Sequence, residues 1–280
     1  ESSHTDIAIC YMKGRVDEQM LTQIKKRMNS IHVDALTMNQ ESLAECLYPH
    51  KWYNPFPKFK FSERPDTAAA SILEGNIIIL VDNSPAAMIL PSSVFDIIEE
   101  ADDYYFPPVT GTYLRLSRMV ISILTLLLTP TWLMLMQNPH LLPPWLEFLK
   151  LSEAPHVPLV FQLFILEFAI DGLRLAAINT PSMLTTPLSV IAGIVLGEYS
   201  VKSGWFNSEV MLYMAFVAVA NYTQPNFELG YAVKFMRIML LILTAALDWV
   251  GFGIGCMILI VLLSTNKTLS GRSYLNVKKN

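Results

Sequence analysis

The chain changes character at Arg118. The next acidic or basic residue is Glu147, and residues 119–136 form an uncharged apolar run. A helix that crosses the ~30 Å hydrocarbon core of a bilayer needs about 20 such residues. We therefore predict that this run is a transmembrane helix. Because the chain is 52% hydrophobic and apolar stretches continue to about Leu263, we expect a helical membrane domain over residues 109–265.

The preceding residues are typical of a small soluble α+β domain, which we place over residues 1–108. Asp17 is the expected N-cap of the first helix, and Gly75 is expected to end the second. The chain has no initiator Met and enters its first strand almost at once, so we expect further residues of this domain before Glu1. The hydrophobic patterns predict strands at 6–12, 76–81 and 86–90, and helices at 18–29, 67–74 and 95–101.

Composition and motifs exclude several classes of function. A net charge of −4 gives no support for nucleic-acid binding. The 3 cysteines are far apart, and the 5 histidines are isolated, with no H-E-x-x-H pattern. No phosphate-binding glycine motif and no G-x-S-x-G sequence occurs. We therefore expect neither an enzyme nor a bound metal or cofactor.

Acidic, aromatic and basic side chains meet just before the first apolar run. Tyrosine rings favour the headgroup level of a bilayer, and arginines hold their end of a span in the cytoplasm. The group serves either as an interfacial anchor or as a coupler between the soluble domain and the membrane. Its members are Asp103, Tyr104, Tyr105, Arg115 and Arg118.

Ionisable residues also occur inside the apolar region. Residues 159–177 are apolar apart from Gln162, Glu167, Asp171 and Arg174, and the last three share one helical face. Charges at membrane depth are costly, so they turn inward, pair or line water. Two interpretations remain open: an internal ion-pair network that fixes packing, and an aqueous path.

Two short apolar segments follow, and both are interrupted. Residues 187–201 contain two glycines and end with Glu198 and Lys202, while residues 210–222 end at Asn221 in a polar, proline-containing stretch. Short or broken segments of this kind build polar paths in channels and transporters. A surface loop is the other interpretation of Asn221.

The last apolar region, residues 229–263, is too long for one span at ~1.5 Å per residue. We predict two helices that turn near Asp248, after which Gly251 and Gly255 form a G-x-x-x-G motif suited to either an internal helix contact or a subunit contact. The region has only Lys234, Arg237 and Asp248 as charges. The basic tail, 266–280, should be cytoplasmic like the front domain. Five or six apolar segments, some broken or re-entrant, are therefore expected.

Three long stretches carry a resemblance to the GerA family of spore germination membrane proteins. They are DDYYFPPVTGTYLRLSR (102–118), Glu167 with the run DGLRLAAINTPSMLTTPLSVIAGIVLGEYSVKSGWFNSE (171–209), and ANYTQPNFELGYAVKFMR (220–237). The resemblance implies a multi-pass protein of the bacterial spore's inner membrane with a cytoplasmic N-terminal domain. It also implies that A-type subunits oligomerise into an ion-conducting assembly and associate with B-type integral-membrane and lipoprotein partners.

One departure bears on the branch of the family. Common A-type subunits read L-R-E-A where this chain has Leu173-Arg174-Leu175-Ala176, with its acidic residue at Asp171 instead. This difference favours a branch other than the nutrient germinant receptor subunits.

The leading hypothesis is an oligomeric ion channel, or channel-like assembly, that contributes to ion release during germination. Its expected partners are the lipid bilayer, further copies of the chain, a B-type subunit and inorganic ions, without nucleic acid. The alternatives are an A-type subunit of a nutrient germinant receptor, a secondary transporter, and a non-conducting membrane scaffold. The candidate pore or polar network consists of Glu167, Asp171, Arg174, Glu198, Lys202 and Asn221.

Overall fold

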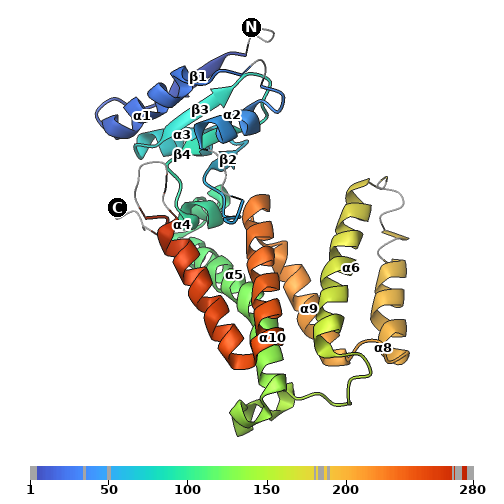
Figure 1. Cartoon of the computed structure of the whole chain (residues 1–280). Coiled ribbons are helices and arrows are strands. Elements are labelled where there is room, and N and C mark those ends of the chain that lie inside the picture. Colours follow the sequence, from blue (N-terminus) through green and yellow to red (C-terminus); the bar gives the residue numbers. More distant parts are fainter. Residues whose placement is uncertain are drawn as a thin grey trace. The chain divides into compact units, whose positions relative to one another are not determined.

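The computed structural model divides the chain into two compact units (Figure 1). It describes residues 5–33, 36–48, 52–179, 181, 186–187, 190–266, 268 and 273–275, without the side chains of residues 101 and 104. The N-terminal unit comprises Glu1–Arg118, Pro225–Ala232 and Leu259–Asn280. The helical unit comprises Met119–Gln224 and Val233–Ile258.

A 4-stranded antiparallel sheet in the order β1-β3-β4-β2 is the centre of the N-terminal unit (Figure 1). Its strands are β1 (Ile7–Cys10), β2 (Lys60–Ser62), β3 (Ile77–Val81) and β4 (Ala87–Leu90). In the register, Ile7 pairs with Val81 and Ile77 pairs with Leu90. The predicted strands at 6–12, 76–81 and 86–90 are confirmed, whereas the short edge strand β2 was not predicted.

Helices cover both faces of this sheet because side chains alternate along β3. Ile77 and Ile79 pack with Met20, Ile24 and Leu43 in one core cluster. Ile78 belongs to a second cluster on the other face. The helices are α1 (Glu18–Asn29), α2 (Gln40–Leu47), α3 (Pro65–Leu73) and α4 (Val94–Ile98), followed by the short 3-10 helix η1 (Ala101–Tyr104).

Local capping explains where several of these helices begin. The Asp17 carboxylate accepts hydrogen bonds from the backbone N–H of Gln19 and Met20 at 3.1 and 3.2 Å, as predicted for an N-cap. At α4, Ser93 and Asp96 form a reciprocal capping box. The predicted helix at 67–74 is α3, the predicted helix at 95–101 is divided between α4 and η1, and α2 was not predicted.

Among the residues that the structure describes, two helices are long and apolar enough to cross a membrane, α5 (Pro108–Gln137) and α10 (Phe227–Thr265), and the larger part of each lies in the helical unit. Both continue into the N-terminal unit. The predicted span 119–136 lies within α5. The other elements are η2 (Pro139–Leu141), η3 (Pro144–Leu149), α6 (Leu159–Asn179), the π-helix η4 (Gly193–Tyr199), α8 (Ser200–Lys202) and α9 (Ser208–Asn221).

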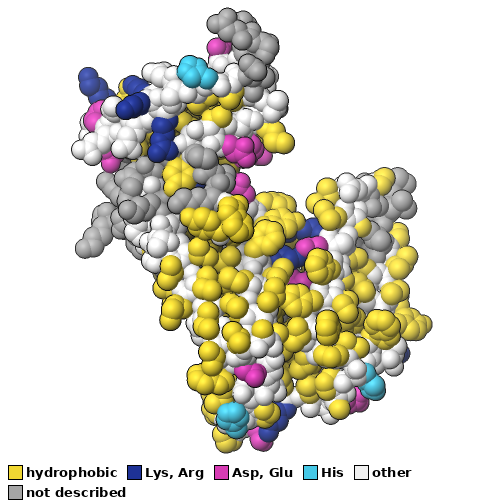
Figure 2. Space-filling view, in the orientation of Figure 1, with side chains coloured by type: hydrophobic (Ala, Val, Ile, Leu, Met, Phe, Trp, Pro, Cys, Tyr) yellow, Lys and Arg dark blue, Asp and Glu magenta, His cyan; other side chains and the backbone are white. Residues whose placement is uncertain are grey.

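The surface of the helical unit is dominated by apolar side chains (Figure 2). Phe161 and Phe168 on α6, Leu212 and Val219 on α9, and Met257 on α10 are each more than half exposed. A water-soluble protein rarely exposes such a continuous apolar surface. The surface therefore agrees with the membrane character that the lengths of α5 and α10 indicate.

Helix α10 is a hairpin of two helical arms, as its length predicted. Asp248 has φ 55° and ψ −139°, which breaks the helix between residues 227–247 and 249–265. Gly251 lies against the backbone carbonyl of Leu243, and a Cβ placed on Gly255 would lie 2.6 Å from Leu240 Cδ2. The G-x-x-x-G motif thus makes an internal contact between the arms.

We predict that Gly251→Ala destabilises the helical unit, because its methyl group would collide with the Leu243 carbonyl. Forced overpacking typically costs about 1–3 kcal/mol. Gly253→Ala is the matched control, since a Cβ there meets nothing within 4 Å and alanine favours a helix. Unfolding of both variants by SDS in mixed micelles measures the difference; equal stability would contradict the close contact.

Candidate functional site

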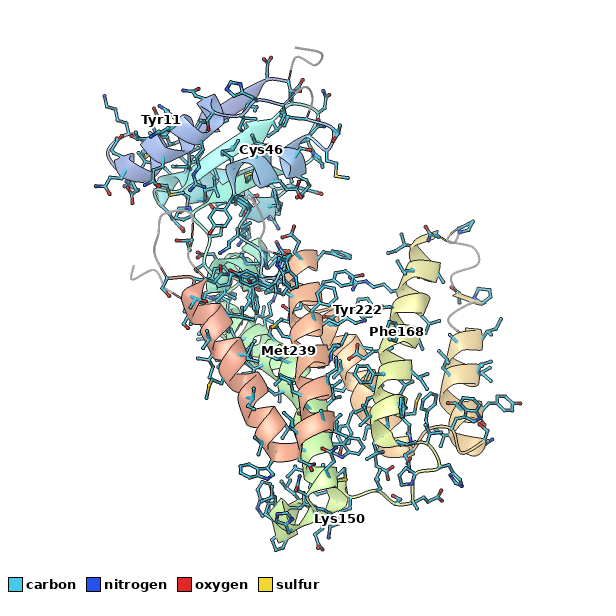
Figure 3. All side chains as sticks on the ribbon, viewed as in Figure 1. Tyr11, Cys46, Lys150, Phe168, Tyr222 and Met239 are labelled. Carbon is cyan, nitrogen blue, oxygen red and sulfur yellow. The ribbon has the colours of Figure 1, made fainter. Side chains whose placement is uncertain are left out.

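A network of charged side chains joins α6 to α10 inside the helical unit. Glu167 and Asp171 are one turn apart on α6, and Lys234 and Arg237 are one turn apart on α10, so each helix presents a pair of like charges on one face. Figure 2 shows acidic and basic side chains among apolar ones in this unit, and the labels Phe168 and Tyr222 in Figure 3 mark the level of the network.

The centre of the network is a bidentate pair between Arg237 and Glu167. Arg237 Nε lies 2.6 Å from Glu167 Oε1, and Nη2 lies 3.0 Å from Oε2. Arg237 Nη1 also donates to the backbone carbonyl of Thr125 on α5 at 3.1 Å. Both charged residues are 2% exposed. The guanidinium therefore connects three helices in a site that is almost closed to solvent.

Lys234 extends the network toward the surface. Its ammonium pairs with the Asp171 carboxylate, lies 3.6 Å from Glu167 Oε2 and donates to the Glu167 carbonyl oxygen at 3.3 Å. The Lys234 side chain is 7% exposed, whereas the Asp171 side chain is 30% exposed. Exposure therefore increases along the network from Glu167 to Asp171.

A small polar cavity of about 20 Å³ borders the more exposed side. Its lining includes Asp171, Arg174 and Asn221, and the Arg174 guanidinium lies 5.6 Å from the centre of the Tyr222 ring. The Asn221 Oδ1 atom is buried and accepts no hydrogen bond within the described part of the chain. A cavity of this size holds one water molecule, for which the threshold is about 10–15 Å³.

The structure thus brings together four of the predicted pore or network residues: Glu167, Asp171, Arg174 and Asn221. The other two, Glu198 and Lys202, form a mutual i,i+4 pair at 2.5 Å with both side chains more than half exposed. This pair is not among the residues that line the cavity.

Sequence reasoning missed the basic half of the network. Lys234 and Arg237 were recognised as the basic residues of the last apolar region, but they were not assigned to the site. Their spacing of three, which places both on one helical face, was the available signal. Charged residues on an apolar helix have few possible partners other than opposite charges on another helix. Comparing the acidic face of α6 with the basic face of α10 would therefore have predicted the pairing.

A second group of predicted residues meets at the beginning of α5. Asp103 is 2% exposed, and its Oδ1 atom lies 3.2 Å from Arg118 Nη2. Arg118 Nη1 also lies 2.5 Å from Glu100 Oε2, while Arg115 Nη1 lies 3.8 Å from Glu99 Oε1. A Cβ on Gly111 would collide with the Asp103 carbonyl. The arginines therefore bind acidic residues of the N-terminal unit.

Tyr105 belongs to a neighbouring surface cluster. Its hydroxyl donates to Asp66, which also pairs with Arg64, and Arg64 pairs in turn with Asp102. The hydrogen bond from Arg64, followed by that from Tyr105, holds the pKa of Asp66 well below its usual value. The same contact with Asp66 raises the pKa of Tyr105. The Tyr104 side chain lies outside the described residues.

Comparison with known proteins identifies the family. The family model described as Bacillus/Clostridium GerA spore germination protein matches residues 1–279. The chain belongs to the GerA family. This GerA chain is 37% identical to stage V sporulation protein AF of Bacillus subtilis (strain 168), over 96% of its own length and 54% of the relative.

Other relatives are named as spore germination proteins. The GerA chain is 30% identical to spore germination protein GerQA of Bacillus cereus, over 98% of the chain and 55% of the relative. It is 26% identical to spore germination protein A1 of Bacillus subtilis (strain 168), over 95% and 55%. The chain thus spans about half the length of these curated relatives. No solved structure matches it.

Removing either member of the Glu167–Arg237 pair should destabilise the helical unit strongly. An uncompensated buried charge typically costs about 3–5 kcal/mol. We expect Glu167→Gln and Arg237→Met each to show this loss in SDS unfolding, and the double variant Glu167→Met/Arg237→Met to recover much of it. Glu198→Gln, in the exposed pair, should change stability by less than about 1 kcal/mol. Additive losses in the double variant would contradict a coupled pair.

The low pKa of Asp66 predicts an acid-sensitive contribution to folding. The contribution is fully present above the unfolded-state pKa of about 3.9 and is lost as the pH falls toward the depressed folded-state value. Melting temperatures measured between about pH 2 and 6 should therefore fall more steeply for the wild type than for Asp66→Asn. Glu63→Gln, at an exposed position nearby, should keep the wild-type profile; identical profiles for all three would refute the assignment.

Proposed function

We propose that this chain is part of a membrane subunit of a spore germination complex that oligomerises and passes ions. The observation that carries the proposal is the charge network of α6 and α10 beside a polar cavity, within a unit whose surface is apolar. Membrane proteins retain ionisable groups at depth chiefly where those groups pair or line a water-filled path. Membership of the GerA family supports the setting in germination.

The network combines the two roles that the sequence left open. The Glu167–Arg237 pair is fully enclosed and has its polar atoms occupied, which suits it to fixing the helices. Asp171 is partly exposed and borders the cavity with Arg174. We assign Asp171, Arg174, Lys234 and Asn221 to the wall of the ion path.

The charge of the wall bears on selectivity. The described residues that line the cavity include three cations, on Arg174, Lys234 and Arg237, and two carboxylates, on Glu167 and Asp171. The formal excess of one positive charge opposes cations in this arrangement and favours anions. Neutralising Lys234 should therefore shift selectivity toward cations.

The proposed topology has both ends of the chain in the cytoplasm and multiple spans in the spore's inner membrane. Tyr274, beyond the last helix, is buried in the N-terminal unit, and its hydroxyl donates to the Pro57 carbonyl at 2.8 Å. An even number of crossings agrees with this contact. We assign the six crossings to α5, α6, the segment that contains η4 and α8, α9 and the two arms of α10. The basic residues of the tail, beyond Asn266, lie outside the described residues.

The proposed partners are further copies of the chain and a B-type integral-membrane subunit. A nutrient germinant receptor A-type subunit is the second candidate function, which the similarity to spore germination proteins GerQA and A1 favours. The higher identity to stage V sporulation protein AF favours the first candidate. A secondary transporter or a scaffold could contain the same charge network, but neither would let ions flow passively across the membrane.

Ion flux through proteoliposomes tests the proposal. The full-length protein, alone and with a co-expressed B-type subunit, should conduct, and Asp171→Asn should change its conductance or reversal potential while assembly is unchanged. In a salt gradient, Lys234→Gln should move the reversal potential toward the equilibrium potential of the cation. The matched control is Glu198→Gln, in the exposed pair away from the cavity. Absence of flux in every combination would refute a channel, and saturable uptake of one substrate would favour a transporter.

A further inference from the structure

The N-terminal unit contains a cavity of about 210 Å³ that the ion path does not use. It lies between α3, the β2–β4 side of the sheet and the segment that follows α4, and its lining includes Ala70 and Ile89. Its volume is far above the roughly 10–15 Å³ that holds one water molecule. The cavity can therefore accept a small organic molecule.

The sequence of α3 explains why this space is open. Ala68 and Ile72 pack against Ile78 and Ile89 of the sheet, so they hold the helix in place. Thr67, Ala70 and Ser71 are small and line the cavity. No residue of α3 is buried, which agrees with a helix that covers the sheet incompletely.

The walls of the cavity are acidic. Four carboxylates and one basic residue, Lys60, are among the described residues that line it. The Lys60 ammonium donates to the backbone carbonyls of Asp96 at 2.5 Å and Glu99 at 2.9 Å, and burial lowers its pKa. The described lining residues alone carry a formal charge of −3, with acidic groups on Asp66, Glu74, Asp96 and Glu99. Arg64 and Arg115, outside the lining, pair with Asp66 and Glu99, so a cationic ligand competes with these two arginines.

The arrangement of the carboxylates favours an organic cation over a metal ion. Among the described residues, no three His, Cys, Asp or Glu side chains are close enough together to hold a metal. A ligand that contacts several of these carboxylates must therefore be extended and carry separated charges. Ala70, Ile89 and Pro91 supply an apolar wall, which suits a short chain of methylene groups.

We propose that this cavity binds a short aliphatic diamine or polyamine. The ammonium groups of the ligand lie against the acidic walls, and its methylene chain lies along Ala70, Ile89 and Pro91. Two of the lining residues also link this region to the beginning of α5. Glu99 is paired with Arg115, and the Tyr105 hydroxyl donates to Asp66. A bound diamine competes for both acidic groups, so its binding alters the contacts at the beginning of α5.

Calorimetric titration with putrescine, a four-carbon diamine, tests the proposal on the full chain in nanodiscs of zwitterionic lipid. Saturable binding of putrescine is expected, and 1,4-butanediol, which has the same chain length without charge, should not bind. Glu74→Gln should weaken binding by about fivefold, since a solvent-exposed charge contact is worth up to about 1 kcal/mol. Its matched control is Glu63→Gln, an exposed acid that does not line the cavity.

A second pair of variants tests the location of the site. Ala70→Leu fills the cavity from an exposed helix position and should abolish binding, whereas Ala69→Leu, on the same helix but outside the lining, should leave it unchanged. Equal binding by the two, equal affinity for the diol, or no binding by the wild type would overturn the proposal. Asp171→Asn should bind putrescine normally, so this result is independent of the ion-flux test.

Discussion

The arrangement of the helical unit depends on the pair between Glu167 and Arg237. A charge placed alone at membrane depth costs from about 2.5 to more than 10 kcal/mol, depending on the system. Both carboxylate oxygens of Glu167 accept from Arg237, and the remaining guanidinium contact goes to the carbonyl of Thr125. Such geometry is available only when α5, α6 and α10 take one relative position. The pair therefore selects an arrangement, whatever its net contribution to stability.

Specificity of this kind matters in a membrane because lipid is as apolar as the helices. Close packing and polar contacts, rather than the hydrophobic effect, then decide which helices associate. The α10 hairpin uses close packing, with Gly251 against the Leu243 carbonyl and Gly255 against the Leu240 side chain. The contact between α6 and α10 uses charge. The two devices together define which face of α10 meets each neighbour.

Local pattern was sufficient to predict much of the fold. The short apolar run from Ile77 to Val81, the cap at Asp17 and the excessive length of residues 229–263 are each features of a single stretch of sequence. The strand β2 was missed because its three residues, Lys60–Ser62, gain their extended form from pairing with β4. Such pairing depends on a distant segment, and intrinsic strand preference is weak beside it.

Only the acidic half of the candidate site, on α6, was predicted from the sequence. The basic half was missed because, as for β2, the contact depends on a distant segment of the chain. Helical periodicity placed Glu167, Asp171 and Arg174 on one face, but the basic partners of Glu167 and Asp171 lie 70 and 63 residues further along the chain. Periodicity within one helix contains no information about which other helix it meets. Likewise, the sequence predicted Arg115 and Arg118 at the membrane junction, whereas their pairing with Glu99, Glu100 and Asp103 depends on the folded N-terminal unit.

The two ion pairs of the network differ in how exposed they are to solvent, and this difference decides which pair is easier to separate. Glu167 and Arg237 are each only 2% exposed, so little solvent can replace a lost partner, and separating them leaves two unpaired charges in a medium of low dielectric. Asp171 is partly exposed, so water can replace part of its contact with Lys234 at lower cost. Of the two contacts, the Asp171–Lys234 contact beside the cavity is therefore the one that separates at lower cost, while the inner pair holds α6 and α10 together.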